Sequence, residues 1–166
     1  MPWSAEDRTE AFESLVRAHE RRVLRVAWRM LGSLEDAQDA AQEVLMKLHR
    51  HFDRIEHASI ESWLYRTTMN ACYDALRRRK PCEPLDFEPA ATHDAGEALH
   101  LDQRRELVAR ALKRLPEKER AAIVLREIEG LDTSEVARIL GTAEVTVRSQ
   151  ISMGKARLKK ILEAMP

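Results

Sequence analysis

The chain is short of the residues that mark several classes of protein. Of its 166 residues only 5 are glycine, and no alternating run rich in valine, isoleucine and threonine indicates a sheet. Two cysteines, Cys72 and Cys82, give no disulfide framework and no zinc site of four ligands. No apolar run approaches the roughly 20 residues of a membrane span, so we expect no membrane insertion. The acidic start MPWSAEDRTE has no apolar core, which excludes a signal peptide and predicts a reduced, cytoplasmic protein.

The chain also lacks a net charge, because its 28 basic residues balance 28 acidic ones. The balance hides a segregation of charge. Residues 1–80 carry 14 basic and 13 acidic side chains, 81–103 carry none basic and 6 acidic, and 104–166 carry 14 basic and 9 acidic. Local charge sets the field at a binding face, so a neutral total does not exclude a nucleic-acid partner.

The residues that are abundant predict an all-α protein. Apolar residues recur at three- and four-residue steps, and Ala, Leu, Glu, Arg and Lys dominate. The expected helices are 10–32, 34–50, 59–79, 99–114, 116–129, 133–140 and a last one from 142 onward. Three prolines in PCEPLDFEPAATHDAGEA predict an acidic linker. We therefore expect two small helical domains, 1–80 and 104–166, joined by a flexible linker over 81–103.

The last two predicted helices and the tight turn between them indicate a helix-turn-helix. Asp132 and Gly141 are expected to cap the shorter helix, Pro116 to stand in the first turn of an earlier helix, and Thr142 to cap the last one. One stripe of the last helix faces the core. The opposite surface carries Val145, Thr146, Ser149, Ser152 and Met153, with Arg148 at its flank. This pattern fits a major-groove binder, although a solvated basic face has the same pattern.

Stretches in both halves of the chain together resemble a known family. SLEDAQDAAQEVLMKLHR and SWLYRTTMNACYDALRRR resemble the second region of bacterial RNA polymerase sigma factors of the extracytoplasmic-function group. The stretch from ALKRLPEKER to ISMGKARLKK resembles the fourth region of that family. The resemblance covers nearly the whole chain in the right order. It implies a protein that binds core RNA polymerase and directs transcription initiation at promoters with −10 and −35 elements.

The resemblance implies roles for individual residues. Core polymerase would be bound by Asp39, Gln42 and Glu43, for which a solvated face is the alternative. The −10 element would be bound by Arg66, Asn70, Tyr73, Arg77 and Arg78, while Trp63 and Tyr65 are as readily core residues. The −35 element would be bound by Thr142, Thr146, Arg148, Ser149, Ser152, Lys155, Arg157 and Lys159, the early residues at base edges and the later ones at phosphates.

The recognition helix departs from the family pattern, in which Gly is frequent at position 145 and Arg at 150 and 153. Val145, Gln150 and Met153 stand there instead, and Ser152 replaces a basic or aromatic residue. The preferred promoter sequence is therefore left open.

The sequence also bears on a further partner and on two alternative functions. The family resemblance implies an anti-sigma factor as an additional partner. We find no catalytic constellation, no cofactor motif and no metal site, since His49 and His51 lie on different sides of a helix, so no enzyme is expected. The alternatives are a freestanding helix-turn-helix regulator that binds operators without being a polymerase subunit, or an enzyme whose site the N-terminal domain hides.

Overall fold

The computed structural model describes residues 4–79 and 98–165, and all regular structure in these ranges is helical. The predicted linker falls largely outside these residues. The elements are α1 (Ala5–Leu31), α2 (Leu34–His51), η1 (Phe52–Arg54), η2 (His57–Ser59), α3 (Ile60–Arg78), α4 (Ala98–Lys113), α5 (Glu117–Ile123), η3 (Val124–Ile128), α6 (Thr133–Leu140) and α7 (Glu144–Ala164). None of these helices is long and apolar enough to cross a bilayer.

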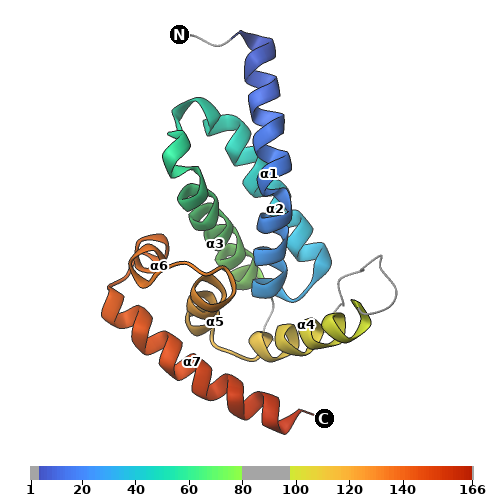
Figure 1. Ribbon diagram of the computed structural model, residues 1–166, viewed down its shortest axis with the longest axis vertical. Helices are drawn as coiled ribbons and strands as arrows, with labels where there is room; N and C mark the ends of the chain where they lie inside the picture. Colours follow the sequence, from blue (N-terminus) through green and yellow to red (C-terminus); the bar gives the residue numbers. More distant parts are fainter. Residues whose placement is uncertain (1–3, 80–97, 166) are drawn as a thin grey trace.

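Helices α1, α2 and α3 form the N-terminal half, in which each helix packs on the other two (Figure 1). Ser33 caps α2 by accepting a hydrogen bond from the backbone N–H of Asp36, as its position in the sequence predicts. Helix α1 begins five residues earlier than its apolar period indicates. The reason is a capping box, in which Ser4 and Asp7 bond each other's backbone N–H groups.

Helices α4 to α7 form the C-terminal half, in which α7 packs on α4, α5 and α6 (Figure 1). Pro116 stands at the N-cap of α5, one position before the expected first turn. The predicted helix 116–129 does not stay α-helical to its end. It continues as the π-helical turn η3, and Glu129 N–H donates to the carbonyl of Val124 at 2.9 Å.

The two halves pack together, because the buried apolar residues of both belong to one continuous cluster. A buried guanidinium also joins them. Arg120 of α5 donates to the carbonyls of Lys113 and Leu115 at 2.9 Å each, and to the carbonyl of Met30 in α1. Burial lowers the pKa of Arg120. The relative placement of the halves is thus held by directional bonds as well as by apolar contact.

Candidate nucleic-acid interface

The helix-turn-helix has the predicted frame. Asp132 caps α6 by accepting from the backbone N–H of Glu135, and Gly141 ends α6 at a φ of 65°. In α7, Val147 and Gly154 are buried against the core of the C-terminal half. An added Cβ at Gly154 would lie 2.5 Å from Cδ1 of Ile123, so glycine allows α7 to approach α5 closely.

The predicted role of Thr142 as the cap of α7 is wrong. Ala143 is the N-cap, and no side chain bonds the helix end there. The backbone N–H of Thr142 instead donates to the carbonyl of Ala137 at 3.0 Å, which places Thr142 in the turn that closes α6. The turn after Gly141 takes one residue more than the sequence indicated.

Two stripes of α7 face different surroundings. Thr142 in the turn and Thr146 and Gln150 on α7 line a pocket toward α3. A second stripe of α7 is exposed and consists of Val145, Ser149 and Met153. Arg148 and Ser152 beside it are exposed as well. The predicted −35 residues are therefore divided between a pocket wall and an open face.

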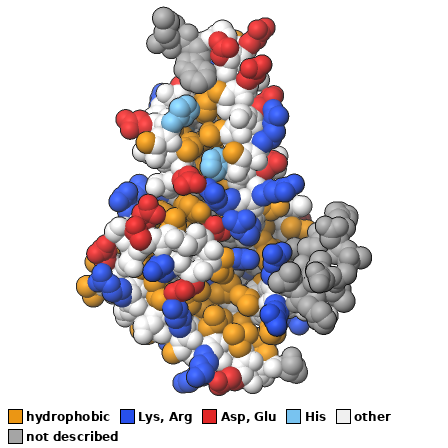
Figure 2. Space-filling view, viewed as in Figure 1, with side chains coloured by type: hydrophobic (Ala, Val, Ile, Leu, Met, Phe, Trp, Pro, Cys, Tyr) orange, Lys and Arg blue, Asp and Glu red, His pale blue; other side chains and the backbone are white. Residues whose placement is uncertain are grey.

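Most of the predicted phosphate-binding residues on α7 have acidic neighbours. The ammonium of Lys155 lies 2.8 Å from Glu127, and the guanidinium of Arg157 lies 3.3 Å from the buried Glu119. Lys159 is exposed and forms no ion pair with any residue that the structure describes. Figure 2 shows basic and hydrophobic side chains interspersed over the lower part of the molecule, where α7 lies in Figure 1. Lys159 is thus the freest of these three cations.

Four of the five predicted −10 residues share one face of α3. Arg66, Asn70, Tyr73 and Arg77 recur at steps of four, three and four residues, which places them in one stripe. Tyr73 is half-buried, and burial raises the pKa of its hydroxyl to about 12. Arg78 is exposed on a different side of the helix, where it lines a pocket with residues of α2.

This α3 stripe faces the C-terminal half. The guanidinium of Arg66 donates to the carbonyl of Arg138 in α6 at 2.8 Å. Tyr73 and Arg77 line a pocket of about 410 Å³ whose opposite wall includes Thr142 and Thr146. Two surfaces that the sequence assigns to different DNA elements therefore meet across one small pocket.

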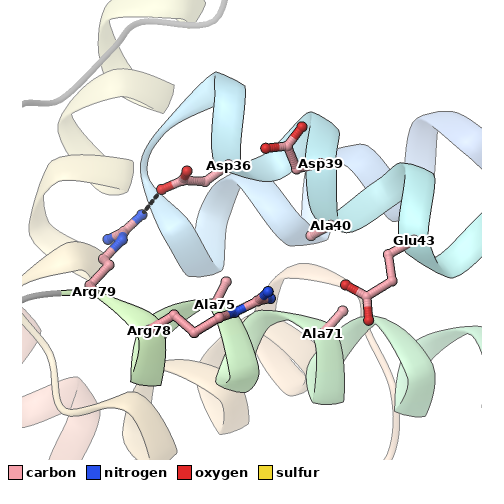
Figure 3. A pocket seen from close by; sticks show the side chains of 8 residues that line it. All are labelled: Asp36, Asp39, Ala40, Glu43, Ala71, Ala75, Arg78 and Arg79. Carbon is pink, nitrogen blue, oxygen red and sulfur yellow. Dashed lines mark hydrogen bonds and ion pairs between the residues drawn. The ribbon is translucent and has the colours of Figure 1, made fainter.

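The three predicted polymerase-binding residues lie on the outer side of α2. Asp39 and Glu43 line a pocket of about 320 Å³ between α2 and α3, and Arg78 reaches into it from α3 (Figure 3). Beside it Arg79 forms an ion pair with Asp36 at 2.6 Å (Figure 3). Gln42 lies instead in a second groove of about 560 Å³ between α1 and α2, whose lining is mainly apolar.

One polar cluster between the halves was missed by the sequence analysis. The carboxylate of Glu129, with 4% of its side chain exposed, accepts from Arg25 Nε at 3.2 Å and Nη2 at 3.0 Å. The hydroxyl of Tyr65 also donates to it at 3.2 Å. Burial and the Glu129 charge raise the pKa of Tyr65 to about 12. We call these three residues the Glu129 cluster. The only feature of the local sequence that points to this cluster is a glutamate directly before Gly130.

The remaining candidate chemistry is limited. Among residues 4–79 and 98–165, no group of three His, Cys, Asp or Glu side chains could hold a metal ion. Cys72 is fully buried, and burial raises the pKa of its thiol to about 12. A protonated thiol of this kind is a weak nucleophile and packs as a small apolar residue.

Comparison with known proteins gives two family matches. Residues 15–81 match the family described as Sigma-70 region 2, and residues 105–158 match Sigma-70, region 4. The first match covers most of α1 and all of α2 and α3. The second covers most of α4, all of α5 and α6, and most of α7.

Individual relatives match the chain over most of its length. The chain is 39% identical to ECF RNA polymerase sigma factor SigM of Mycobacterium tuberculosis, over 92% of this chain and 77% of the relative. It is 29% identical to ECF RNA polymerase sigma factor SigW of Bacillus subtilis, over 92% and 89%. Its fold is similar to that of the sigma factor RpoE of Bartonella quintana, solved with the anti-sigma factor NepR. That comparison has a TM-score of 0.75 at 23% identity and covers 95% and 99% of the two chains.

Proposed function

The chain belongs to the ECF RNA polymerase sigma factors of the sigma-70 family, and we propose that it performs their task through three separate faces. As a sigma factor it binds core RNA polymerase and directs transcription initiation at promoters. The presence of both sigma-70 regions, in order on one helical chain, carries this conclusion. Sigma factors are recognition subunits and not the catalytic part of the polymerase, and we assign no catalytic residue to this chain.

The −35 element is assigned to the open face of α7. Arg148 and Ser149 lie in the second turn, where side chains of a recognition helix reach base edges. Ser152 follows one turn later on the same side. Lys159 is assigned to a phosphate, and Lys155 and Arg157 can join it only by leaving Glu127 and Glu119. Thr142 and Thr146 are assigned to the flank of this interface.

The −10 element is assigned to the α3 stripe. A single strand requires ring faces for stacking, polar groups for base edges and cations for phosphates. Tyr73 supplies the ring, Asn70 the amide, and Arg66 and Arg77 the charge. Arg78 lies on another side of α3, and its place beside Asp39 and Glu43 favours a role near the polymerase-binding face.

The outer side of α2 is assigned to core polymerase. Asp39 and Glu43 present two carboxylates at the rim of one pocket, and Gln42 adds an amide at the neighbouring groove. A partner with basic side chains complements Asp39, which is exposed and forms no ion pair with any described residue, while Glu43 can join it only by leaving Lys47, which lies 3.1 Å away. We also expect an anti-sigma factor that covers these faces, and copurification of the full chain from its native host tests this expectation.

Charge reversal on α2 tests the assignment. We expect Asp39→Lys with Glu43→Lys to abolish binding to core polymerase and transcription from a genomic promoter library. The helix itself should persist, because both side chains lie outside the buried face of α2, which circular dichroism can verify. The measurements are pull-down with core polymerase and in vitro transcription.

The matched control is Glu10→Lys with Glu13→Lys, which makes the same charge change at exposed positions of α1. This control should keep both activities. Unchanged polymerase binding by the α2 variant contradicts the assigned face. Failure of the unaltered chain to bind core polymerase, together with direct operator binding, favours the freestanding regulator instead.

A further inference from the structure

Exposed hydrophobic side chains are concentrated on the recognition helix. Among the described residues, three large hydrophobic side chains are exposed: Met46 at 51%, Val145 at 72% and Met153 at 48%. Two of the three lie on α7, whose other exposed residues are polar, charged or small. Apolar side chains exposed singly are normal on protein surfaces, so Val145 and Met153 carry an inference only through their common position beside basic residues on the recognition helix.

Val145 and Met153 belong to the same stripe of α7. They stand at positions i and i+8, with Ser149 between them, so all three lie on one side of the helix. The hydroxyl of Ser149 donates to the sulfur of Met153 at 3.7 Å, which holds the thioether along the stripe. This stripe is distinct from the pocket wall of Thr142, Thr146 and Gln150, so packing between the two halves does not cover it.

The chemistry of the partner follows from the neighbouring residues. Arg148 and Lys159 are both exposed on the same side of α7, next to the stripe, so the stripe has a basic neighbourhood that complements DNA. Within the major groove the C5-methyl group of thymine is the apolar feature that an aliphatic side chain can contact. We infer that Val145 and Met153 are specificity-determining residues that each contact a thymine methyl group in the −35 element. This inference rests on the proposed function.

The spacing of the two side chains makes the inference quantitative. Eight residues of α-helix advance about 12 Å along the axis. Successive base pairs are about 3.4 Å apart along a strand. The two thymines should therefore be separated by about three to four base pairs, on one strand or on opposite strands. Val145 lies nearer the end of the helix that enters the groove, so its thymine should be the more strongly preferred.

Replacement of thymine by uracil tests the contacts directly, because deoxyuridine lacks only the C5-methyl group. A promoter library transcribed with the full chain and core polymerase first identifies the preferred −35 element. Each thymine on either strand is then replaced singly by deoxyuridine. We expect transcription by the unaltered protein to fall by about threefold to fivefold at two positions, the size expected for one buried methyl group.

The variants assign each thymine to a side chain. Val145→Ala should be insensitive to uracil at one of the two positions, and Met153→Ala at the other. Lys159→Ala is the control, which should lower transcription from all templates alike and keep both uracil effects. The inference is overturned if Val145→Ala and Met153→Ala keep the same uracil sensitivity as the unaltered protein, or if no thymine is preferred. Absence of transcription by the unaltered protein on every template overturns the proposed function instead.

Discussion

At the scale of single residues, Arg148 and Lys159 are both basic, but we assign them different contacts because their positions on α7 differ. Arg148 lies 3.7 Å from Glu144, and both side chains are largely exposed, so the ion pair contributes little and holds Arg148 weakly. Its planar guanidinium suits a guanine edge, to which it can donate two hydrogen bonds. Lys159 lies about three turns later, beyond the part of α7 that we assign to base edges, and its ammonium suits a phosphate.

We expect different losses from the two truncations. Arg148→Ala should relax the preference at one base pair by about 1–3 kcal/mol and lower transcription from promoters with an intact −35 element. Lys159→Ala should weaken all promoters alike and reduce the salt dependence of binding by about one unit of slope. The measurement is a promoter library transcribed with each variant over a range of salt concentrations. An unchanged base preference with Arg148→Ala excludes Arg148 as a base contact.

At the scale of elements, the geometry of the helix-turn-helix depends on one backbone conformation. Gly141 ends α6 at a φ of 65°, where residues with a Cβ pay a steric cost. An added Cβ would meet no atom within 4 Å. A substitution at Gly141 therefore changes the conformational energy of the backbone and leaves the packing contacts unchanged.

We therefore expect Gly141→Ala to lower the free energy of unfolding by about 1 kcal/mol, from a left-handed cost partly offset by a less flexible unfolded chain. Gly141→Asn is the matched control and should cost less, because asparagine adopts this conformation more readily. Urea unfolding followed by circular dichroism gives both values. Equal losses for alanine and asparagine contradict a conformational origin.

The elements also show which features a sequence reveals. Ser33, Asp132 and the glycines that end helices act through neighbours within a few residues, so their roles were predictable. Thr142 was misassigned because Gly141 is followed by one more turn residue than a direct junction requires. The π-helical turn η3 was not foreseen, since its wider spacing leaves no mark in the apolar period.

The features of the candidate site also separate into those that local sequence predicts and those that depend on tertiary packing. The common face of Arg66, Asn70, Tyr73 and Arg77 follows from helical spacing alone. The ion pair of Lys155 with Glu127 and that of Arg157 with Glu119 depend on how α7 packs, which no local pattern specifies. Glu129 joins residues about 60 and 100 positions away in sequence. The sequence therefore predicted the faces, and tertiary packing decided what each face meets.

At the scale of the whole molecule, the two halves are arranged so that the α3 stripe lies beside the C-terminal half, although Arg66, Asn70 and Arg77 keep exposed side chains. Arg66 is bonded to α6, and Tyr73 and Arg77 line the same pocket as Thr142 and Thr146 of the C-terminal half. The open stripe of α7 stays accessible in the same arrangement. We expect separation of the halves to release Arg66 and Tyr73 for a −10 strand, and the ion pair of Arg25 with Glu129 opposes that separation.

The last prediction is that loss of the Glu129 carboxylate opens the free protein. Hydrogen bonds to a charged group contribute about 1.5–3 kcal/mol, which corresponds to roughly a 10- to 100-fold shift of an equilibrium. Glu129→Ala should therefore raise the radius of gyration in small-angle X-ray scattering. It should also strengthen binding of the free protein to single-stranded −10 DNA, measured by fluorescence polarisation.

Transcription with core polymerase should change little with Glu129→Ala, because no residue that we assign to polymerase or promoter DNA belongs to the Glu129 cluster. Glu127→Ala is the matched control: it removes the same side chain two residues earlier, and its ion pair with Lys155 lies within the C-terminal half. The control should alter neither the scattering radius nor the binding of single strands. If the unaltered protein already scatters as two separated domains, the Glu129 cluster does not hold the halves together in solution. If Glu129→Ala opens the molecule without stronger binding, the α3 stripe is not the surface that holds the −10 strand.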